Sequence, residues 1–334
     1  MRDLYGASVV VTGASSGIGR ATALAFARCG ARVSLAARRG DVLEDVANEC
    51  RRVGGEAIAV PTDVTDPAAV AALAHASERA FGGIDVWVNN AGTGVFGPYT
   101  DAPLELHRRT IEVNLLGAMY GAYAVLPLFL HQGRGVLINT ISLAAWAPNP
   151  FAAAYTASKF GLRGFAASLR QELGSHPDIH VCGVFPAIID TPGFVHGANM
   201  SGRQIDIGPL IYAPEDVAET IVSLARWPRD EVAVGWPARA AQIAYTIARR
   251  PTEQLAGAFI RRALRQAQPA PRSEGALMWP VPQGTSISGG WRQRKGVPAG
   301  RRATRIGLAV AGAAALILGT TAAAYGRSNH RQRR

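Results

Sequence analysis

A short apolar run, a glycine-rich turn and an alanine-rich segment open the chain, and together they limit its fold more than any other feature. Residues 7–11 (Ala-Ser-Val-Val-Val) are typical of a buried strand, and a helix is predicted over residues 20–29. Between them, glycines stand at positions 13, 17 and 19. Glycine allows positive φ and close approach of the backbone to a ligand, and a helix N-terminus attracts anions. This order predicts a dinucleotide site, although the spacing differs from G-x-G-x-x-G; a tight turn without ligand is the alternative.

Short apolar runs separated by helical patterns continue to about residue 240. They are apolar on both sides of the pleat, which is typical of parallel strands buried on both faces. The sequence therefore predicts one α/β domain over residues 1–245, a doubly wound parallel sheet of about seven strands with helices on both faces. The further predicted strands are 32–36, 57–60, 84–89, 136–140, 179–184 and 231–234. The further predicted helices are 41–53, 67–81, 103–130, 155–174 and 214–226.

Tyr155 and Lys159 stand four residues apart, with Ser142 thirteen residues upstream of the tyrosine. Only two of the 35 basic residues are lysines, so a compact ammonium is retained here in a chain that otherwise uses arginine. Positions i and i+4 share a helix face, and a nearby cation lowers the pKa of a tyrosine toward that of a general acid/base. A surface Tyr and Lys that happen to share a helix are the alternative.

Five motifs, in order and at matching separations, resemble those of the short-chain dehydrogenase/reductase family over roughly residues 4–240. The motifs are Thr12 to Gly19, Asn89-Asn90-Ala91-Gly92, Asn114, Ser142, and Tyr155 with Lys159. The resemblance implies a Rossmann fold and hydride transfer between a nicotinamide dinucleotide and a carbonyl or alcohol substrate.

The resemblance also implies catalytic roles for four residues. Tyr155 would protonate the carbonyl oxygen or deprotonate the alcohol, and Ser142 would hydrogen-bond that oxygen. Lys159 would lower the pKa of Tyr155 and hold the nicotinamide ribose. Asn114 would connect the site to water through Lys159.

Cofactor choice can be predicted from the end of the second strand. Ala37 stands where family members that prefer NAD carry Asp, and Arg38 follows it, so NADP(H) is favoured over NAD(H). A pair of solvated arginines is the alternative. Pro186-Ala187 departs from the usual Pro-Gly of the family, beside the nicotinamide. The cofactor contacts that the resemblance implies are Gly13, Ser15, Ser16, Gly17, Ile18, Gly19, Arg38, Asp63, Val64, Asn90, Ala91, Gly92, Tyr155, Lys159, Pro186, Ile188 and Thr191.

Positive charge is concentrated behind the predicted domain. Residues 1–245 carry 19 basic and 22 acidic side chains, whereas residues 246–334 carry 16 and 2. Residues 251–267 form a basic amphipathic pattern in which Leu255, Phe259, Ile260 and Leu264 alternate with arginines. Two interpretations stay open, a helix at a membrane surface and a helix packed over the substrate pocket. The Pro/Gly/Ser-rich residues 268–300 predict an extended connection with little core of its own.

Residues 306–324 contain no charged side chain and are flanked by arginines. Nineteen residues of helix reach about 28 Å, close to the thickness of a bilayer core. We expect a lipid bilayer as a partner through this C-terminal helix, with the catalytic domain in the cytoplasm, and an Ala-rich soluble or surface helix is the alternative. No leader pattern precedes the first predicted strand.

Several classes of function are weighed together. A membrane-anchored NADP(H)-dependent reductase or dehydrogenase leads, ahead of a catalytically silent scaffold protein and an isomerase or dehydratase of the wider family. We predict no metal site and no nucleic-acid partner, because the seven His and the cysteines lack ligand spacing and the order of the tail favours lipid. We expect a homo-oligomer, and a substrate-selecting lid around residues 194–212.

Overall fold

A seven-stranded parallel sheet forms the centre of the protein and confirms the predicted doubly wound fold. The computed structural model describes residues 3–208 and 210–297, and residues 1–291 form one compact unit. The strand order is β11-β7-β6-β4-β1-β2-β3. The chain adds β2 and β3 on one side of β1 and the later strands on the other, so the order of addition reverses between β1 and β4. These strands are β1 (Ser8–Thr12), β2 (Arg32–Ala37), β3 (Glu56–Pro61), β4 (Val86–Asn89), β6 (Gly135–Thr140), β7 (Ile179–Pro186) and β11 (Glu231–Val234).

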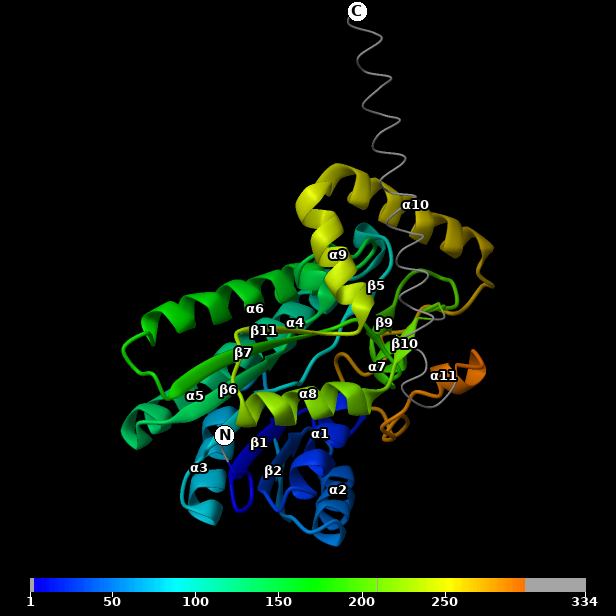
Figure 1. The fold of residues 1–334 in the computed structure, drawn as a ribbon. Helices are drawn as coiled ribbons and strands as arrows, with labels where there is room; N and C mark the ends of the chain where they lie inside the picture. Colours follow the sequence, from blue (N-terminus) through cyan, green and yellow to red (C-terminus); the bar gives the residue numbers. More distant parts are fainter. Residues whose placement is uncertain (1–2, 209, 298–334) are drawn as a thin grey trace, which may run out of the picture. The chain divides into compact units, whose positions relative to one another are not determined.

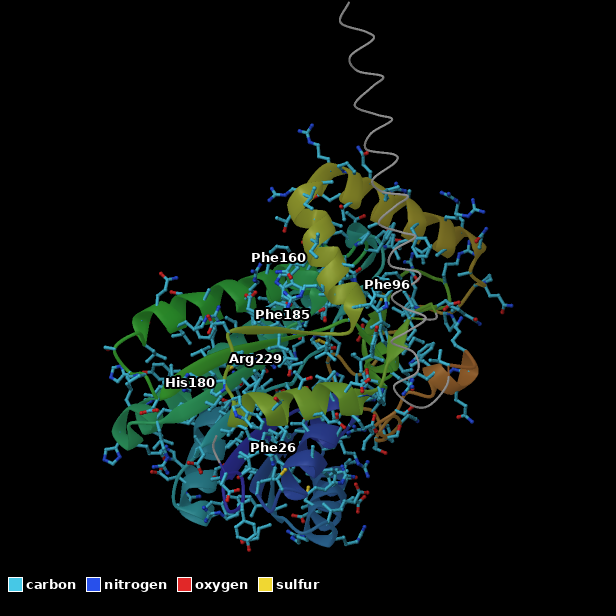
Figure 2. The ribbon with its side chains drawn as sticks, viewed as in Figure 1. Phe26, Phe96, Phe160, His180, Phe185 and Arg229 are labelled. Carbon is cyan, nitrogen blue, oxygen red and sulfur yellow. The ribbon has the colours of Figure 1, made fainter. Side chains whose placement is uncertain are left out.

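Alternating side chains of the central strands fill two separate cores, one on each face of the sheet. Val9 and Val11 of β1 belong to one hydrophobic cluster, and Val10 between them belongs to the other. The same alternation holds in β4 and β6, because successive residues of a strand point to opposite faces. Phe26 and Phe185 are fully buried and lie on opposite sides of the drawn sheet (Figure 2). Burial on both faces explains why these runs are apolar without alternation.

Helices cover both faces of this sheet (Figure 1). One layer contains α1, α2 and α8, in which α1 contacts both neighbours, and the other contains α3, α5 and α6. The main helices are α1 (Gly17–Ala27), α2 (Gly40–Arg52), α3 (Pro67–Phe81), α4 (Leu104–Ile111), α5 (Gly117–Gln132), α6 (Ala153–Glu172) and α8 (Pro214–Arg226). The shorter elements are β5 (Val95–Phe96), η1 (Tyr99–Asp101), η3 (Leu143–Ala145), β8 (Ile188–Ile189), α7 (Gly193–His196), β9 (Ala198–Asn199) and β10 (Ile211–Tyr212).

The long helix predicted over residues 103–130 is interrupted. A π-helical turn, η2 (Glu112–Leu116), separates α4 from α5 and contains the buried Asn114. Periodicity does not register such a turn, and π-turns of this kind are common at functional sites. By length and composition Leu104–Gln132 is the one candidate membrane span among the described residues, yet α5 packs on α3 and β4 within the α/β fold.

The segment after residue 245 contains the helix that the basic amphipathic pattern predicts over residues 251–267. Two helices, α9 (Trp236–Ile247) and α10 (Arg249–Gln266), follow the sheet, and a short α11 (Trp291–Arg294) comes last. The compact unit extends to Trp291. Residues 268–300 were predicted to be an extended connection with little core of its own, and Leu277 of this connection is 1% exposed among buried residues of β5, α4 and β9. Residues 306–324, the predicted membrane helix, lie outside the described residues.

The closest packing between α1 and the glycine turn supplies a test of the fold. A Cβ on Gly19 would lie 2.1 Å from the carbonyl oxygen of Gly13, whereas a Cβ on Gly164 of α6 would meet nothing within 4 Å. We expect Gly19→Ala to destabilise the protein by at least about 1–3 kcal/mol through overpacking. Gly164→Ala should stabilise it by about 0.5–1 kcal/mol, because alanine is the better helix former. Thermal unfolding measures both, and a Gly19→Ala variant as stable as wild type would contradict the packing.

Candidate active site at the carboxyl ends of the strands

The glycine turn brings the first helix against the end of β1. Gly13 and Gly17 have φ of +67° and +54°, conformations that only glycine adopts readily. A Cβ on Gly13 would also lie 2.9 Å from the Cα of Ala91, at the end of β4. The backbone thus leaves a cradle that side chains would fill, at the positive N-terminus of α1.

Thr12 and Asn90 join the ends of β1 and β4. The Thr12 hydroxyl accepts hydrogen bonds from the backbone N–H groups of Asn90 and Ala91, at 2.9 and 3.1 Å, and donates to the carbonyl of Val88. The Asn90 amide donates to the carbonyl of Thr12 at 2.9 Å. These bonds hold the two loops together at the point where the strand order reverses, where open α/β sheets bind ligands.

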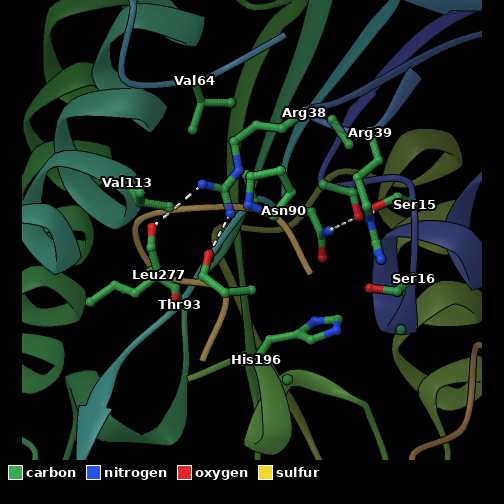
Figure 3. Close-up of a pocket in the computed structure, with 18 of the residues that line it drawn as sticks. Ser15, Ser16, Arg38, Arg39, Val64, Asn90, Thr93, Val113, His196 and Leu277 are labelled. Atoms are coloured by element: carbon green, nitrogen blue, oxygen red, sulfur yellow. Dashed lines mark hydrogen bonds between the residues drawn. The ribbon is translucent and has the colours of Figure 1, made fainter. Parts of the chain in front are cut away.

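A cleft opens along these loops (Figure 3). It encloses about 230 Å³ and brings together most of the residues predicted to contact a cofactor. Those that line it are Gly13, Ser15, Ser16, Gly17, Ile18, Arg38, Asp63, Val64, Asn90, Ala91, Gly92 and Thr191. The others do not line this cleft: Gly19 packs beneath the turn, and Tyr155, Lys159, Pro186 and Ile188 lie on α6 and around β7 and β8.

Positive charge gathers at one end of the cleft. Arg38 and Arg39 follow β2, and burial lowers the pKa of each guanidinium, an effect that Asp63 opposes at Arg38. Burial favours a higher pKa for Asp63, but hydrogen bonds from Thr65 and from Arg109, whose Nη2 donates at 2.6 Å, hold it below its usual value. This end of the cleft therefore suits an anionic group that supplies acceptors to arginine.

Tyr155, Lys159 and Ser142 come together beside Gly92 and Gly94. Tyr155 and Lys159 stand on the first turns of α6, and the Lys159 Nζ lies 5.7 Å from the centre of the Tyr155 ring. Ser142 comes from the loop after β6 and lies close enough to hydrogen-bond Tyr155. A Cβ on Gly94 would lie 3.2 Å from the Tyr155 ring, so a larger residue would crowd the tyrosine.

The pKa of Tyr155 departs from the expectation. Burial raises it above its ordinary value, and the nearby Ser142 hydroxyl only opposes this shift in part. Lys159 is not among the causes of the shift; its side chain is buried, and its ammonium donates to the carbonyl of Thr140 at 2.9 Å. Burial lowers the pKa of Lys159 to about 8. The free site thus holds a protonated tyrosine beside a lysine that titrates close to neutrality.

Asn114 is fixed by its surroundings. Its side chain accepts from the backbone N–H of Thr93 at 2.8 Å and donates to the carbonyl of Thr93 and to the hydroxyl of Ser158. No direct hydrogen bond joins Asn114 to Lys159 among the described contacts, and the expected connection of Lys159 to water through Asn114 stays a prediction. Asn114 and Lys159 instead lie on the same side of Gly92, at 3.5 and 3.7 Å from the position of an added Cβ.

Sequence reasoning missed several residues around the site. His196 of α7 lines the cleft, and burial lowers its pKa further below neutrality than its bond to Gln283 can offset. Phe151, just before α6, has a φ of +61°, the one described non-glycine residue with positive φ. Such a conformation costs about 1–3 kcal/mol and is concentrated at functional sites. The Phe151 ring meets Phe96 edge-on, with centroids 6.3 Å apart.

The largest unexpected contribution comes from residues 275–289, which we name the strap. Ala276, Leu277, Pro280 and Val281 of this segment line the cleft, facing the glycine turn across it. Arg38 donates from Nη2 to the carbonyl of Ala276 at 2.5 Å (Figure 3). Its Nη1 donates to the carbonyl of Met278 at 3.0 Å. No local pattern in the sequence predicts that the strap docks on the cleft.

The part of the chain that the structure describes contains no cluster of side chains that could bind a metal ion. No set of three or more His, Cys, Asp or Glu residues there could hold an ion. The three cysteines are free thiols, of which Cys50 and Cys182 are buried and Cys29 is partly exposed.

Known proteins share this arrangement. The family model described as short chain dehydrogenase matches residues 7–199. The uncharacterized oxidoreductase YxnA of Bacillus subtilis is 33% identical over 281 residues, covering 83% of this chain and 79% of that protein. An uncharacterized oxidoreductase of Staphylococcus aureus, SA2266, is 34% identical over 66% of this chain and 91% of its own length. The probable oxidoreductase EphD of Mycobacterium tuberculosis is 36% identical over 67% of this chain, but only 40% of that protein is matched.

Solved structures with nicotinamide dinucleotides share the fold. An alcohol dehydrogenase from the archaeon Thermococcus sibiricus, complexed with 5-hydroxy-NADP, is 29% identical with a TM-score of 0.61, covering 68% of this chain and 95% of its own. A metagenomic short-chain oxidoreductase in complex with NADP is 36% identical with a TM-score of 0.59, covering 70% and 98%. A Burkholderia phymatum enzyme in complex with NAD is 25% identical with a TM-score of 0.66, covering 76% and 96%.

Proposed function

Because this chain belongs to the short-chain dehydrogenase family, whose relatives named above are oxidoreductases, we propose that it is an NADP(H)-dependent reductase or dehydrogenase. Its substrate is a carbonyl compound or the corresponding alcohol. The observation that carries the proposal is the meeting of Tyr155, Lys159 and Ser142 beside a cleft lined by the glycine turn. When bound, the dinucleotide supplies or accepts the hydride.

The residues of the cleft fit a dinucleotide. Gly13, Gly17 and Gly19 leave a cradle at the N-terminus of α1 that suits a pyrophosphate. Arg38 and Arg39 supply cations where a 2′-phosphate would sit, and Ala37 offers no acid for a free ribose hydroxyl. NADP(H) is therefore preferred over NAD(H). Two of the three structural neighbours were solved with NADP or a derivative, and the third with NAD.

Tyr155 is the general acid and base of the proposed reaction. With its pKa raised by burial it stays protonated at neutral pH, which suits donation of a proton to a carbonyl oxygen during reduction. Ser142 holds the same oxygen by donating a hydrogen bond. Lys159, fixed by the carbonyl of Thr140, supplies a positive charge beside the tyrosine while it remains protonated.

Aromatic side chains close to the start of α6 favour an apolar substrate. Phe96 and Phe151 pack together close to the start of α6, and Gly97 donates its N–H to the carbonyl of Phe151 at 2.8 Å. Aromatic rings held in this way favour a lipophilic carbonyl or alcohol. Exposed apolar side chains on α5, among them Tyr123 at 84% exposure, also favour a homo-oligomer.

Association with a lipid bilayer is the remaining part of the proposal. Leu255 and Phe259 share one face of α10 and are 53% and 70% exposed, which favours the surface interpretation over a helix buried on the substrate pocket. Arg261, Arg262 and Arg265 are exposed on the same helix. An apolar face with cations is the pattern of a helix that lies in an anionic membrane interface. The uncharged residues 306–324 would add an anchor.

Turnover with a panel of carbonyl compounds tests the proposed activity. We expect NADPH oxidation with at least one lipophilic ketone or aldehyde. Tyr155→Phe should lower kcat by at least about 100-fold, because the phenolic proton is needed in the transition state. Binding of NADPH, measured by fluorescence titration, should stay within about twofold of wild type, since the hydroxyl is not part of the main cleft. A folded Tyr155→Phe variant with near-normal turnover would show that another group transfers the proton.

The lowered pKa of Lys159 predicts a pH dependence. A lowered pKa means that Lys159 loses its proton, and with it the positive charge, as the pH rises through about 8. Tyr155 stays protonated there because its own pKa is raised. We therefore expect kcat/KM for reduction to be level near neutrality and to fall above about pH 8. Lys159→Arg should abolish that alkaline decline even if its activity is lower, since arginine keeps its charge. An unchanged decline in this variant would exclude Lys159 as its source.

Fractionation of cells tests membrane association. We expect the full-length chain in the membrane fraction, retained through high salt and through alkaline carbonate if residues 306–324 insert. Leu255→Asp with Phe259→Asp should weaken binding to anionic vesicles, whereas Tyr5→Ser, at another exposed aromatic side chain, should not. Wild-type protein found only in the soluble fraction would end this part of the proposal.

A further inference from the structure

The strap bonds to four groups in or beside the cleft that could hold a phosphate, namely three arginines and one backbone N–H at the start of α1. Arg39 donates from Nη1 to the carbonyls of Val281 and Gln283, at 2.8 and 3.2 Å. Arg20, on the first turn of α1, donates to the carbonyl of Thr285 at 2.6 Å. The backbone N–H of Gly17, at the N-terminus of the same helix, donates to the carbonyl of Ser286 at 3.0 Å. When the Arg38 bonds are included, peptide carbonyl oxygens of the strap accept hydrogen bonds from three arginines and from the N–H of Gly17.

The strap is anchored by contacts that do not involve those donors. The N–H of Ala276 donates to the carbonyl of His196 at 2.7 Å, and the N–H of Gly289 donates to the carbonyl of Asp190 at 3.1 Å. The Ser288 hydroxyl donates to the Asp190 carboxylate at 2.8 Å. Leu277 is buried in a hydrophobic cluster with Val95. The strap can therefore stay docked without help from a ligand.

Strap and dinucleotide need the same atoms. A backbone N–H such as that of Gly17 makes one good hydrogen bond, so it cannot serve Ser286 and a phosphate at once. The cleft with the strap in place encloses about 230 Å³, less than the range of about 300–1,000 Å³ that is usual for small-molecule sites. A phosphate gives charge-assisted bonds to arginine, which are stronger than those of a neutral carbonyl. A phosphorylated ligand can therefore replace the strap.

We propose that the strap is an autoinhibitory segment, an intramolecular competitor that occupies the phosphate-binding groups of the cofactor cleft and is displaced when a dinucleotide binds. The proposal rests on the proposed function only in that this cleft binds a dinucleotide. The apparent affinity equals the affinity of the open form multiplied by the fraction of molecules in which the strap is open. Because linkage is reciprocal, dinucleotide binding must release the strap to the same degree.

A single methyl group can loosen the strap without touching the cleft donors. Gly275 has a φ of +57°, and its added Cβ would lie 2.4 Å from the carbonyl oxygen of His196, so Gly275→Ala should lift the first anchor. Gly202→Ala is the matched control, because Gly202 has a φ of +67° but no atom within 4 Å of an added Cβ. Ser288→Ala is a second, milder variant that removes the bond to Asp190 at the other end.

Titration calorimetry with NADP⁺ on full-length protein gives the test. We expect Gly275→Ala to lower the Kd by roughly three- to tenfold, Ser288→Ala to lower it less, and Gly202→Ala to leave it unchanged. Hydrogen exchange of wild-type protein should become faster in peptides covering residues 275–289 when NADP⁺ is added. This measurement needs no variant, so it still tests the proposal if a variant fails to fold.

The opposite results identify a different role. If Gly275→Ala and Ser288→Ala raise the Kd and NADP⁺ slows exchange in the strap, the segment is a wall that packs on the bound cofactor and the proposal is overturned. Unchanged affinity and exchange also overturn it. Failure of wild type and all variants to bind either NADP⁺ or NAD⁺ would instead remove the proposed function, an outcome that the same titrations distinguish.

Discussion

Close approach of three backbone segments at the carboxyl end of β1 is the constraint on which the rest of the structure depends. Gly19 allows α1 to meet the carbonyl of Gly13, and Thr12 and Asn90 lock the loop after β4 onto the same point. The N-terminus of α1, the arginines after β2 and the loop after β4 reach a common cleft only because no side chain separates them. One methyl group at this position would affect helix docking and ligand binding together.

Burial shifts the pKa values of Tyr155 and Lys159 in opposite directions. The same dry environment raises the pKa of the Tyr155 phenol and lowers that of the Lys159 ammonium, because it penalises the charged form of each. The two values move toward a state in which the tyrosine is neutral and the lysine is only weakly basic. In the free site the phenol therefore keeps its proton, and the ammonium loses its proton more readily than a lysine in water.

Much of this protein could be predicted from local patterns, and the failures share a cause. Every strand of the main sheet gave a compact apolar run, and most of the cleft residues that were predicted follow a strand end, where pattern and position coincide. The π-turn at Asn114 was missed because it preserves the apolar helix pattern on both sides. The strap was missed because a segment rich in Pro, Gly and Ser predicts a loop without a fixed position. Its docking depends on backbone carbonyl groups, which every residue has and which therefore leave no signal in the sequence. The pKa of Tyr155 was predicted with the wrong sign, because desolvation is a property of the folded environment and not of spacing.

Because the strap comes late in the chain, the other parts of the cleft are synthesised before it. All the groups of the cleft other than the strap precede residue 200, and the last strand of the sheet ends at Val234. A ribosome adds the 42 residues from there to Ala276 in about 2–8 s. For that interval an emerging chain that has already folded its sheet presents an open cleft. A dinucleotide present during synthesis meets the nascent protein before the segment that we propose as its competitor exists.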